Sequence, residues 1–157
     1  MKNYAKTILV ILFINFVEFR ISSFLSEFYI VFPVTFLFYS YYVYQSKENI
    51  GSLEAFLLGL FVDLISNSFL GLNAILFCLI THLINLYSNS FKLFSYLQIC
   101  IFFGLSAASY IGFSQLIINI YNFSYLTLLI STIFNIFFTS IVAISSIYLR
   151  SFFKFNK

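Results

Sequence analysis

Residues 55–75 read AFLLGLFVDLISNSFLGLNAI and hold a single carboxylate, Asp63, inside an otherwise apolar run. The run breaks at Ser66-Asn67-Ser68 and resumes after Leu70-Gly71. An ionisable side chain at membrane depth is costly, so it is expected to face the interior of a helix bundle rather than lipid. The segment therefore predicts two apolar helices joined by a short polar break, with a buried acid close to the turn.

The composition of the whole chain places it in the class of integral membrane proteins. Of its 157 residues, 62% are hydrophobic and 8% are charged, whereas soluble domains carry about a quarter charged residues. Between Lys92 and Arg150 there is no Asp, Glu, Lys or Arg, which leaves room for two spans of ~20 residues and a connection. No polar segment is long enough for a soluble domain. We therefore expect one transmembrane domain over residues 1–157.

Hydropathy and the polar breaks predict an all-α fold, a bundle of six membrane helices. The expected ranges are residues 4–24, 29–44, 51–66, 69–88, 93–119 and 124–153. The third is short, because about sixteen residues at ~1.5 Å each reach ~24 Å, less than a ~30 Å hydrocarbon core. It is either a short span in a locally thinned bilayer or part of a re-entrant hairpin with a broken helix.

The distribution of basic residues favours six spans over five. With six spans and both termini in the cytoplasm, the outer side receives one basic residue, Arg20. The basic residues expected on the inner side are Lys2, Lys6, Lys47, Lys92, Arg150, Lys154 and Lys157. Five spans would place one terminal cluster outside, against the positive-inside rule. We therefore predict a multi-pass protein with both termini cytoplasmic.

Small and polar residues recur at helical spacing and predict the seams along which the helices meet, since membrane helices associate through close approach and hydrogen bonds. In chain order these seams are Ser52, Ala55, Gly59 and Asp63; Gly71, Ala74, Cys78, His82 and Asn85; Gly104, Ala108, Gly112 and Gln115; and Thr127, Ser131, Asn135, Thr139 and Ala143.

Folding the chain about Ser68 brings residues of two neighbouring helices level with each other. Asp63 then lies opposite Asn73, and a hydrogen bond between them would lower the cost of burying the carboxylate. Glu54 lies opposite His82 near the cytoplasmic side, where the two are expected to form an ion pair. We expect these contacts to fix the hairpin rather than to relay protons.

Catalytic, metal-binding and nucleic-acid-binding functions find little support in the sequence. The chain has one His and five acidic residues, and no Gly-rich phosphate loop or metal-ligand cluster. Glu18, Arg20 and Glu27 are interpreted as solvated or paired charges near the outer surface, and Cys78 and Cys100 as packing residues. Basic residues are too scattered for a nucleic-acid patch. We expect no catalytic residue, metal, cofactor or nucleic-acid partner.

The pattern G-L-x-x-D-L-I-S, a polar break, then L-G-x-x-A resembles the signature segment of the rod shape-determining protein family MreD. The matching residues are Gly59, Leu60, Asp63, Leu64, Ile65, Ser66, Leu70, Gly71 and Ala74. The resemblance implies a non-enzymatic scaffold of the bacterial cell-elongation complex in the cytoplasmic (inner) membrane, supporting lateral peptidoglycan synthesis and cell shape. The implied partners are MreC, the MreB filament, a peptidoglycan transglycosylase and a penicillin-binding transpeptidase, within the lipid bilayer.

Transport is the alternative function. An acid beside a helix break is similar to the discontinuous-helix sites of transporters, and the six-span layout resembles the vitamin-binding S components of energy-coupling-factor transporters. Those subunits carry an alanine-spaced docking motif on their first helix, where this chain offers only Ala5. The missing motif favours the scaffold. The segment from Asp63 to Gly71 is then expected either to shape the fold or to form the docking face for the membrane helix of MreC.

Overall fold

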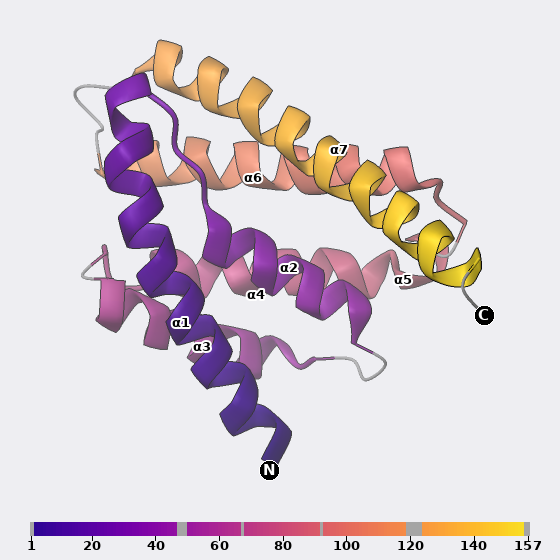
Figure 1. Cartoon of the computed structure of the whole chain (residues 1–157). Helices are drawn as coiled ribbons and strands as arrows, with labels where there is room; N and C mark the ends of the chain where they lie inside the picture. The colour runs from indigo at the N-terminus through magenta and orange to yellow at the C-terminus, as the bar shows by residue number, and fades with distance from the viewer. Residues whose placement is uncertain (1, 47–49, 67, 92, 119–123, 156–157) are drawn as a thin grey trace.

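A computed structural model describes residues 2–46, 50–66, 68–91, 93–118 and 124–155, with side chains described within residues 9–117 and 124–142 of these ranges. Over these ranges the fold is all-α and has no strand (Figure 1). The elements are α1 (Lys2–Leu25), η1 (Ser26–Phe28, a 3₁₀ turn), α2 (Val34–Gln45), α3 (Ser52–Ser66), α4 (Leu72–Leu86), α5 (Ser88–Phe91), α6 (Tyr96–Ile118) and α7 (Tyr125–Phe155).

Two hairpins, α3 with α4 and α6 with α7, make the most extensive contacts between helices. Helix α2 lies between these hairpins and contacts both α4 and α6, while α1 packs across α2 and α3. In the view of Figure 1, α6 and α7 lie above α2 and α4, and α3 lies below α4. The α6–α7 hairpin is therefore joined to the rest of the described bundle chiefly through α2 and the segment that precedes it.

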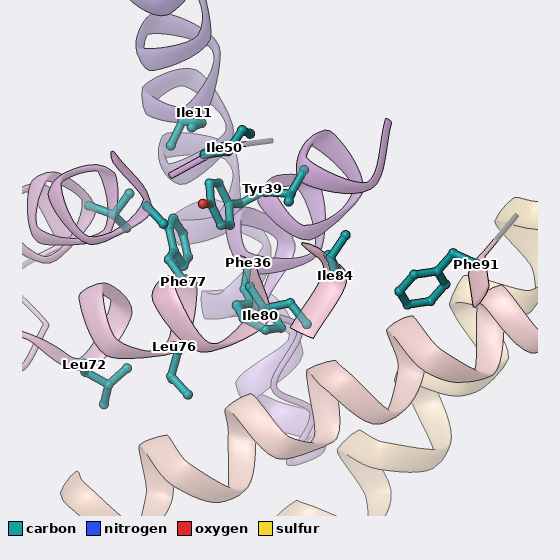
Figure 2. Packing of buried hydrophobic residues seen from close by; sticks show 13 residues of the cluster. Ile11, Phe36, Tyr39, Ile50, Leu72, Leu76, Phe77, Ile80, Ile84 and Phe91 are labelled. Carbon is teal, nitrogen blue, oxygen red and sulfur yellow. The ribbon is translucent and has the colours of Figure 1, made fainter. Parts of the chain in front are cut away.

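The centre of the apolar core is the contact between α2 and α4 (Figure 2). The rings of Tyr39 and Phe77 are fully buried and stacked, with centroids 4.0 Å apart and planes at 4°. The Tyr39 hydroxyl is hydrogen-bonded to the Thr81 hydroxyl at 2.7 Å, which gives a buried polar group the partner it needs. The stacked rings and the hydrogen bond together fix the position of α2 along α4.

Helix α2 begins at Val34, five residues later than the sequence analysis predicts from position 29. The physical reason is Pro33, which occupies the N-cap position with ψ at 76° and follows non-helical residues 30–32. Proline disfavours helical geometry in the residue before it, so the chain enters α2 extended. The predicted helix over 69–88 also differs, because it starts at Leu72 and is followed by the separate α5 turn.

Within the described residues, three helices are long and apolar enough to cross a membrane, with candidate spans at Leu9–Phe28, Tyr96–Ile117 and Tyr125–Val142. Helices α2, α3 and α4 have 12, 15 and 15 residues, or about 18–22 Å. Six membrane crossings, a single domain and a layout like that of the transporter S components therefore stay predictions.

The orientation of the termini also stays a prediction. Of the basic residues behind it, Arg20 alone has a described side chain, which is exposed and lies over the Phe16 ring at 5.8 Å. The side chains that fall outside the described part of the chain are those of Lys2, Lys6, Lys47, Lys92, Arg150, Lys154 and Lys157.

Candidate functional site: a carboxylate clasp in the α3–α4 hairpin

The Asp63 carboxylate lies in the last turn of α3, is 1% exposed, and accepts hydrogen bonds at both oxygens. Its Oδ1 accepts from the Ser68 hydroxyl at 2.8 Å, from the Asn73 side-chain amide at 2.8 Å and from the Asn73 backbone N–H at 3.1 Å. Its Oδ2 accepts from the backbone N–H groups of Gly71 at 2.9 Å and Ala74 at 3.4 Å. We call this set of five residues the Asp63 clasp.

The backbone donors of the clasp are the first N–H groups of α4, which no residue inside that helix can accept. Gly71 is the N-cap residue, and Asn73 and Ala74 lie in the first turn. The remaining N–H at this end, that of Leu72, donates to the Phe69 carbonyl at 3.1 Å. The start of a helix also favours negative charge, so an anion supplied by α3 is stabilised there by both hydrogen bonding and the helix dipole.

Two glycines allow the clasp to close. Gly71 has φ of 95°, a backbone conformation that residues with a Cβ rarely adopt, and it turns the chain into α4. Gly59 lies where α3 crosses α4, and a Cβ there would be 2.4 Å from the Ala74 Cα. Because that neighbouring atom is backbone, a side chain at position 59 requires the two helices to separate.

The clasp is connected to the rest of the bundle through Asn73. Its side-chain oxygen accepts a hydrogen bond from the Tyr110 hydroxyl of α6 at 2.8 Å. The Tyr110 ring packs against Phe36 of α2, with centroids 4.8 Å apart. One buried asparagine therefore joins α3, α4 and α6 at the same level of the molecule.

The structure brings together most of the residues singled out in the sequence. The contact expected between Asp63 and Asn73 is present, and Ala74 is fully buried at the helix crossing. The Ser66 hydroxyl donates to the Val62 carbonyl at 2.8 Å and to the Ser68 hydroxyl at 3.0 Å, so it adjoins the clasp. Leu70 is 65% exposed and takes no part in it. The functional role of these residues stays a prediction.

The predicted ion pair between Glu54 and His82 is wrong. Both side chains are described, both are exposed, and no ion pair joins them. Each lies one position away from a fully buried residue, Ala55 in α3 and Thr81 in α4. One position is about 100° around a helix, so both side chains point away from the seam although they are level along it.

Glu18, expected to be a solvated or paired charge near the outer surface, is a second capping carboxylate. Glu18 is half-buried, and its Oε2 accepts a hydrogen bond from the Thr35 backbone N–H in the first turn of α2 at 2.7 Å. The arrangement repeats that of Asp63: an acid on one helix caps the next helix along the chain. An acid ahead of a short connection that ends in Pro33 was the available signal, but the exposed Glu27 fits it as well.

A third polar contact holds the segment between η1 and α2, where the backbone is not helical. Val31 donates its N–H to the Ser131 hydroxyl at 2.9 Å and accepts from the Asn135 side-chain amide at 3.0 Å. Ser131 and Asn135 are fully buried on α7, as the predicted seam on residues 124–153 implies. Irregular backbone inside a membrane protein must have such partners, and α7 supplies them.

The chemistry available to the clasp is that of a saturated hydrogen-bond acceptor. Four donors lie within 3.1 Å of the Asp63 oxygens, about the full acceptor capacity of a carboxylate. Among the described residues, no group of three or more His, Cys, Asp or Glu side chains is placed to hold a metal ion. The arrangement fastens two helices and leaves the carboxylate no free lone pair for a substrate.

The sequence matches a known protein family over nearly its whole length. The sequence model of the family described as rod shape-determining protein MreD matches residues 2–151 of the chain. Neither a curated protein nor a solved structure matches it. The family match extends far beyond the clasp and includes, in whole or in part, each α-helix of the described residues.

Proposed function

The chain belongs to the MreD family of rod shape-determining membrane proteins, and from this premise we propose that it is a non-enzymatic scaffold of the cell-elongation complex. In this role it holds the membrane helix of MreC and, through MreC, supports the MreB filament and the transglycosylase and transpeptidase that build lateral peptidoglycan. It acts as a multi-pass protein of the bacterial inner membrane with both termini in the cytoplasm.

The observation that carries the scaffold role is the saturation of Asp63. A carboxylate that binds cargo or moves protons must exchange partners, whereas this one is 1% exposed and accepts from side-chain and backbone donors of its own hairpin. Its removal would leave the N–H groups of Gly71, Asn73 and Ala74 at the start of α4 without an acceptor. The alternative, a vitamin-type substrate-binding subunit of a transporter, gains no support from the comparisons.

We propose that MreC binds the exposed apolar face of α3, which we call the α3 stripe. Four large apolar side chains are exposed there at helical spacing: Leu53 (72%), Leu57 (57%), Phe61 (43%) and Leu64 (63%). Leu64 belongs to the segment that resembles the family signature. Its side chain is exposed, so packing inside the chain does not explain why a leucine stands at this position. The place of this stripe beside the signature segment supports the proposal, since apolar side chains alone are equally stable against lipid.

The test distinguishes the effect of a change in the Asp63 clasp from that of a change in the α3 stripe, in the same bacterium. The protein is depleted from its bacterium and replaced by tagged variants, and cell shape, protein level and co-purification of MreC are measured. We expect Asp63→Asn to lower the protein level, and the cells to lose their rod shape as a result. The double variant Leu57→Ala and Leu64→Ala should keep the protein level and lose MreC.

The control is the double variant Leu129→Ala and Ile133→Ala on the exposed face of α7, which should retain both MreC and rod shape. Retention of MreC and of rod shape by the α3 double variant would remove this stripe from the interface. Normal morphology after complete depletion would contradict the scaffold role itself.

A further inference from the structure

Helix α1 carries an exposed stripe of side chains that the rest of the described structure does not cover. Of its candidate span, 6% is buried inside the molecule, against 28% for the span of α6. Five side chains recur there at helical spacing, and we call them the α1 stripe: Leu9, Phe13, Phe16, Arg20 and Phe24. The four apolar members are 61–67% exposed. The stripe therefore combines one positive charge with apolar surface on both sides of it.

The charge of the α1 stripe lies near the middle of the span, although the sequence predicts Arg20 near the outer surface. The candidate span runs from Leu9 to Phe28, so Arg20 is eight residues, or about 12 Å, short of its end. Its side chain runs back toward the start of the helix, and the guanidinium carbon lies 5.8 Å from the centre of the Phe16 ring. The guanidinium therefore points away from the nearer end of the span.

This charge has no counter-charge in the described part of the chain. The contact found for the Arg20 guanidinium is the Phe16 ring, and no carboxylate pairs with it. Glu18 lies about 200° around the helix, and its carboxylate is bound to the Thr35 backbone N–H. Glu27 lies in η1, beyond the end of α1. A contact with an aromatic ring recovers less than a charge costs at the centre of a membrane span, so the arrangement is incomplete as it stands.

From the exposure, the depth and the missing counter-charge, we propose that the α1 stripe docks a membrane helix of another protein that carries an Asp or Glu within its span. That acid pairs with Arg20, and apolar side chains of the same helix pack on Phe13, Phe16 and Phe24. Charged residues inside membranes are mostly paired with one another, so charge complementarity selects this partner. A lipid phosphate fits less well, because the guanidinium points away from the nearer headgroup layer.

A second copy of this chain does not supply the missing acid. In a symmetric pair of copies inserted in the same orientation, the two Arg20 side chains reach the same level, where like charges repel. The acid of α1 at that level, Glu18, already caps α2. Asp63 is 1% exposed and bound within its own hairpin. The occupant is therefore a different protein. The α1 stripe lies on another helix than the α3 stripe, so this inference goes beyond the proposed MreC site and does not depend on it.

Photo-cross-linking in the protein's own bacterium tests the proposal. A photoreactive amino acid replaces Phe13 or, as a second position, Phe24 in the full-length protein. Each version is made with Arg20, with Arg20→Lys, which keeps the charge, and with Arg20→Leu, which removes it. The same photoreactive amino acid at Phe137, on the exposed face of α7, is the control position. The cross-linked products are purified and the partner peptide is identified by mass spectrometry.

We expect one protein product from both α1 positions, absent from position 137, whose cross-linked membrane helix contains an acid. Arg20→Leu should reduce this product about tenfold or more, as the loss of one member of a desolvated charge pair predicts, whereas Arg20→Lys should keep most of it. Changing the partner's acid to its amide should cause the same loss while Arg20 is intact. If Arg20→Leu lowers the protein level, Arg20→Gln takes its place.

Four results would overturn the proposal: cross-links to lipid alone, cross-links to a second copy of the chain, a partner helix without an acid, or a product that the loss of the Arg20 charge leaves unchanged. None of them bears on co-purification of MreC, so this inference and the scaffold role can fail separately.

Discussion

The two helical hairpins of this protein, α3–α4 and α6–α7, close in different ways. Each has a glycine at the crossing, Gly59 against Ala74 and Gly104 against Ile136. In α3–α4 a buried carboxylate adds hydrogen bonds across the crossing, several of them at or below 3.1 Å. In the described part of α6–α7, a long hydrogen bond crosses the hairpin from the Thr139 hydroxyl to the Cys100 carbonyl, at 3.5 Å.

This difference shows what a buried charge contributes to a membrane hairpin. Apolar packing tolerates small sliding motions, because many arrangements of Phe, Ile and Leu have similar energies in lipid. A carboxylate with fixed donors accepts only one register, and a change that breaks it leaves buried polar groups unpaired. The α3–α4 hairpin should therefore be far more sensitive to substitution than α6–α7.

Replacing Asp63 should have the largest effect. Asp63→Leu removes the acceptor of several backbone N–H groups at the start of α4, so we expect a loss of about 3–5 kcal/mol in the free energy of unfolding. Reversible unfolding in detergent micelles measures it. The matched change in the other hairpin, Thr139→Val, should cost less than about 1 kcal/mol. Equal losses in the two hairpins would contradict the comparison.

Gly59→Ala should be the next most damaging change. The added Cβ would meet the Ala74 Cα at 2.4 Å and the Asn73 carbonyl oxygen at 2.6 Å, and backbone atoms cannot move aside. We expect a loss of about 2–3 kcal/mol, at the upper end of the range for overpacking. Thermal unfolding of the purified variant checks it. An unchanged midpoint would show that α3 and α4 do not approach so closely.

Gly104→Ala makes the same change in α6–α7 and should cost about 1 kcal/mol. The nearest atom to the added Cβ is the Ile136 Cγ1 at 2.8 Å, which belongs to a side chain that can adjust, although the Ile136 Cα lies at 3.0 Å. The same unfolding assay compares it with Gly59→Ala. A larger loss at position 104 than at position 59 would reverse the proposed order of the two crossings.

Gly112→Ala should have the smallest effect and serves as a control for changing glycine in a helix. Its added Cβ would meet only the Leu128 Cδ1 at 3.5 Å, an ordinary contact. Alanine favours a helix over glycine by up to about 1 kcal/mol, so the variant should be as stable as the original or slightly more so. A clear loss of stability would mean that helix contacts near position 112 are tighter than the structure describes.

The sequence predicted the parts of the fold in which a residue type leaves few choices. A lone Asp beside a polar break indicated a hairpin with a buried acid, and counting outward from Ser68 placed Asn73 opposite it, where the hydrogen bond lies at 2.8 Å. The same reasoning predicted the buried seam of α7 at Ser131 and Asn135. Buried polar residues are informative because they require specific partners.

Predictions from the sequence were wrong where the contacts of a side chain depend on its direction around the helix or on a partner far away in the chain. Glu54 and His82 are level with each other, but each is rotated out of the seam by one position. Glu18 caps α2 from across the α1–α2 turn, and neither its type nor its spacing distinguishes it from the exposed Glu27. The donors to Asp63 are mostly backbone N–H groups, which every residue type but proline carries.

The most direct test of whether Asp63 stabilises the α3–α4 hairpin is a double-mutant cycle between Asp63→Ala and Asn73→Ala. The free energy of unfolding of each variant is measured in detergent micelles. If the two side chains stabilise α3–α4 through their contact, the pair will be coupled by about 1–3 kcal/mol. Losses that add to within about 0.3 kcal/mol would contradict the account, because the carboxylate would then act independently of its hairpin partner.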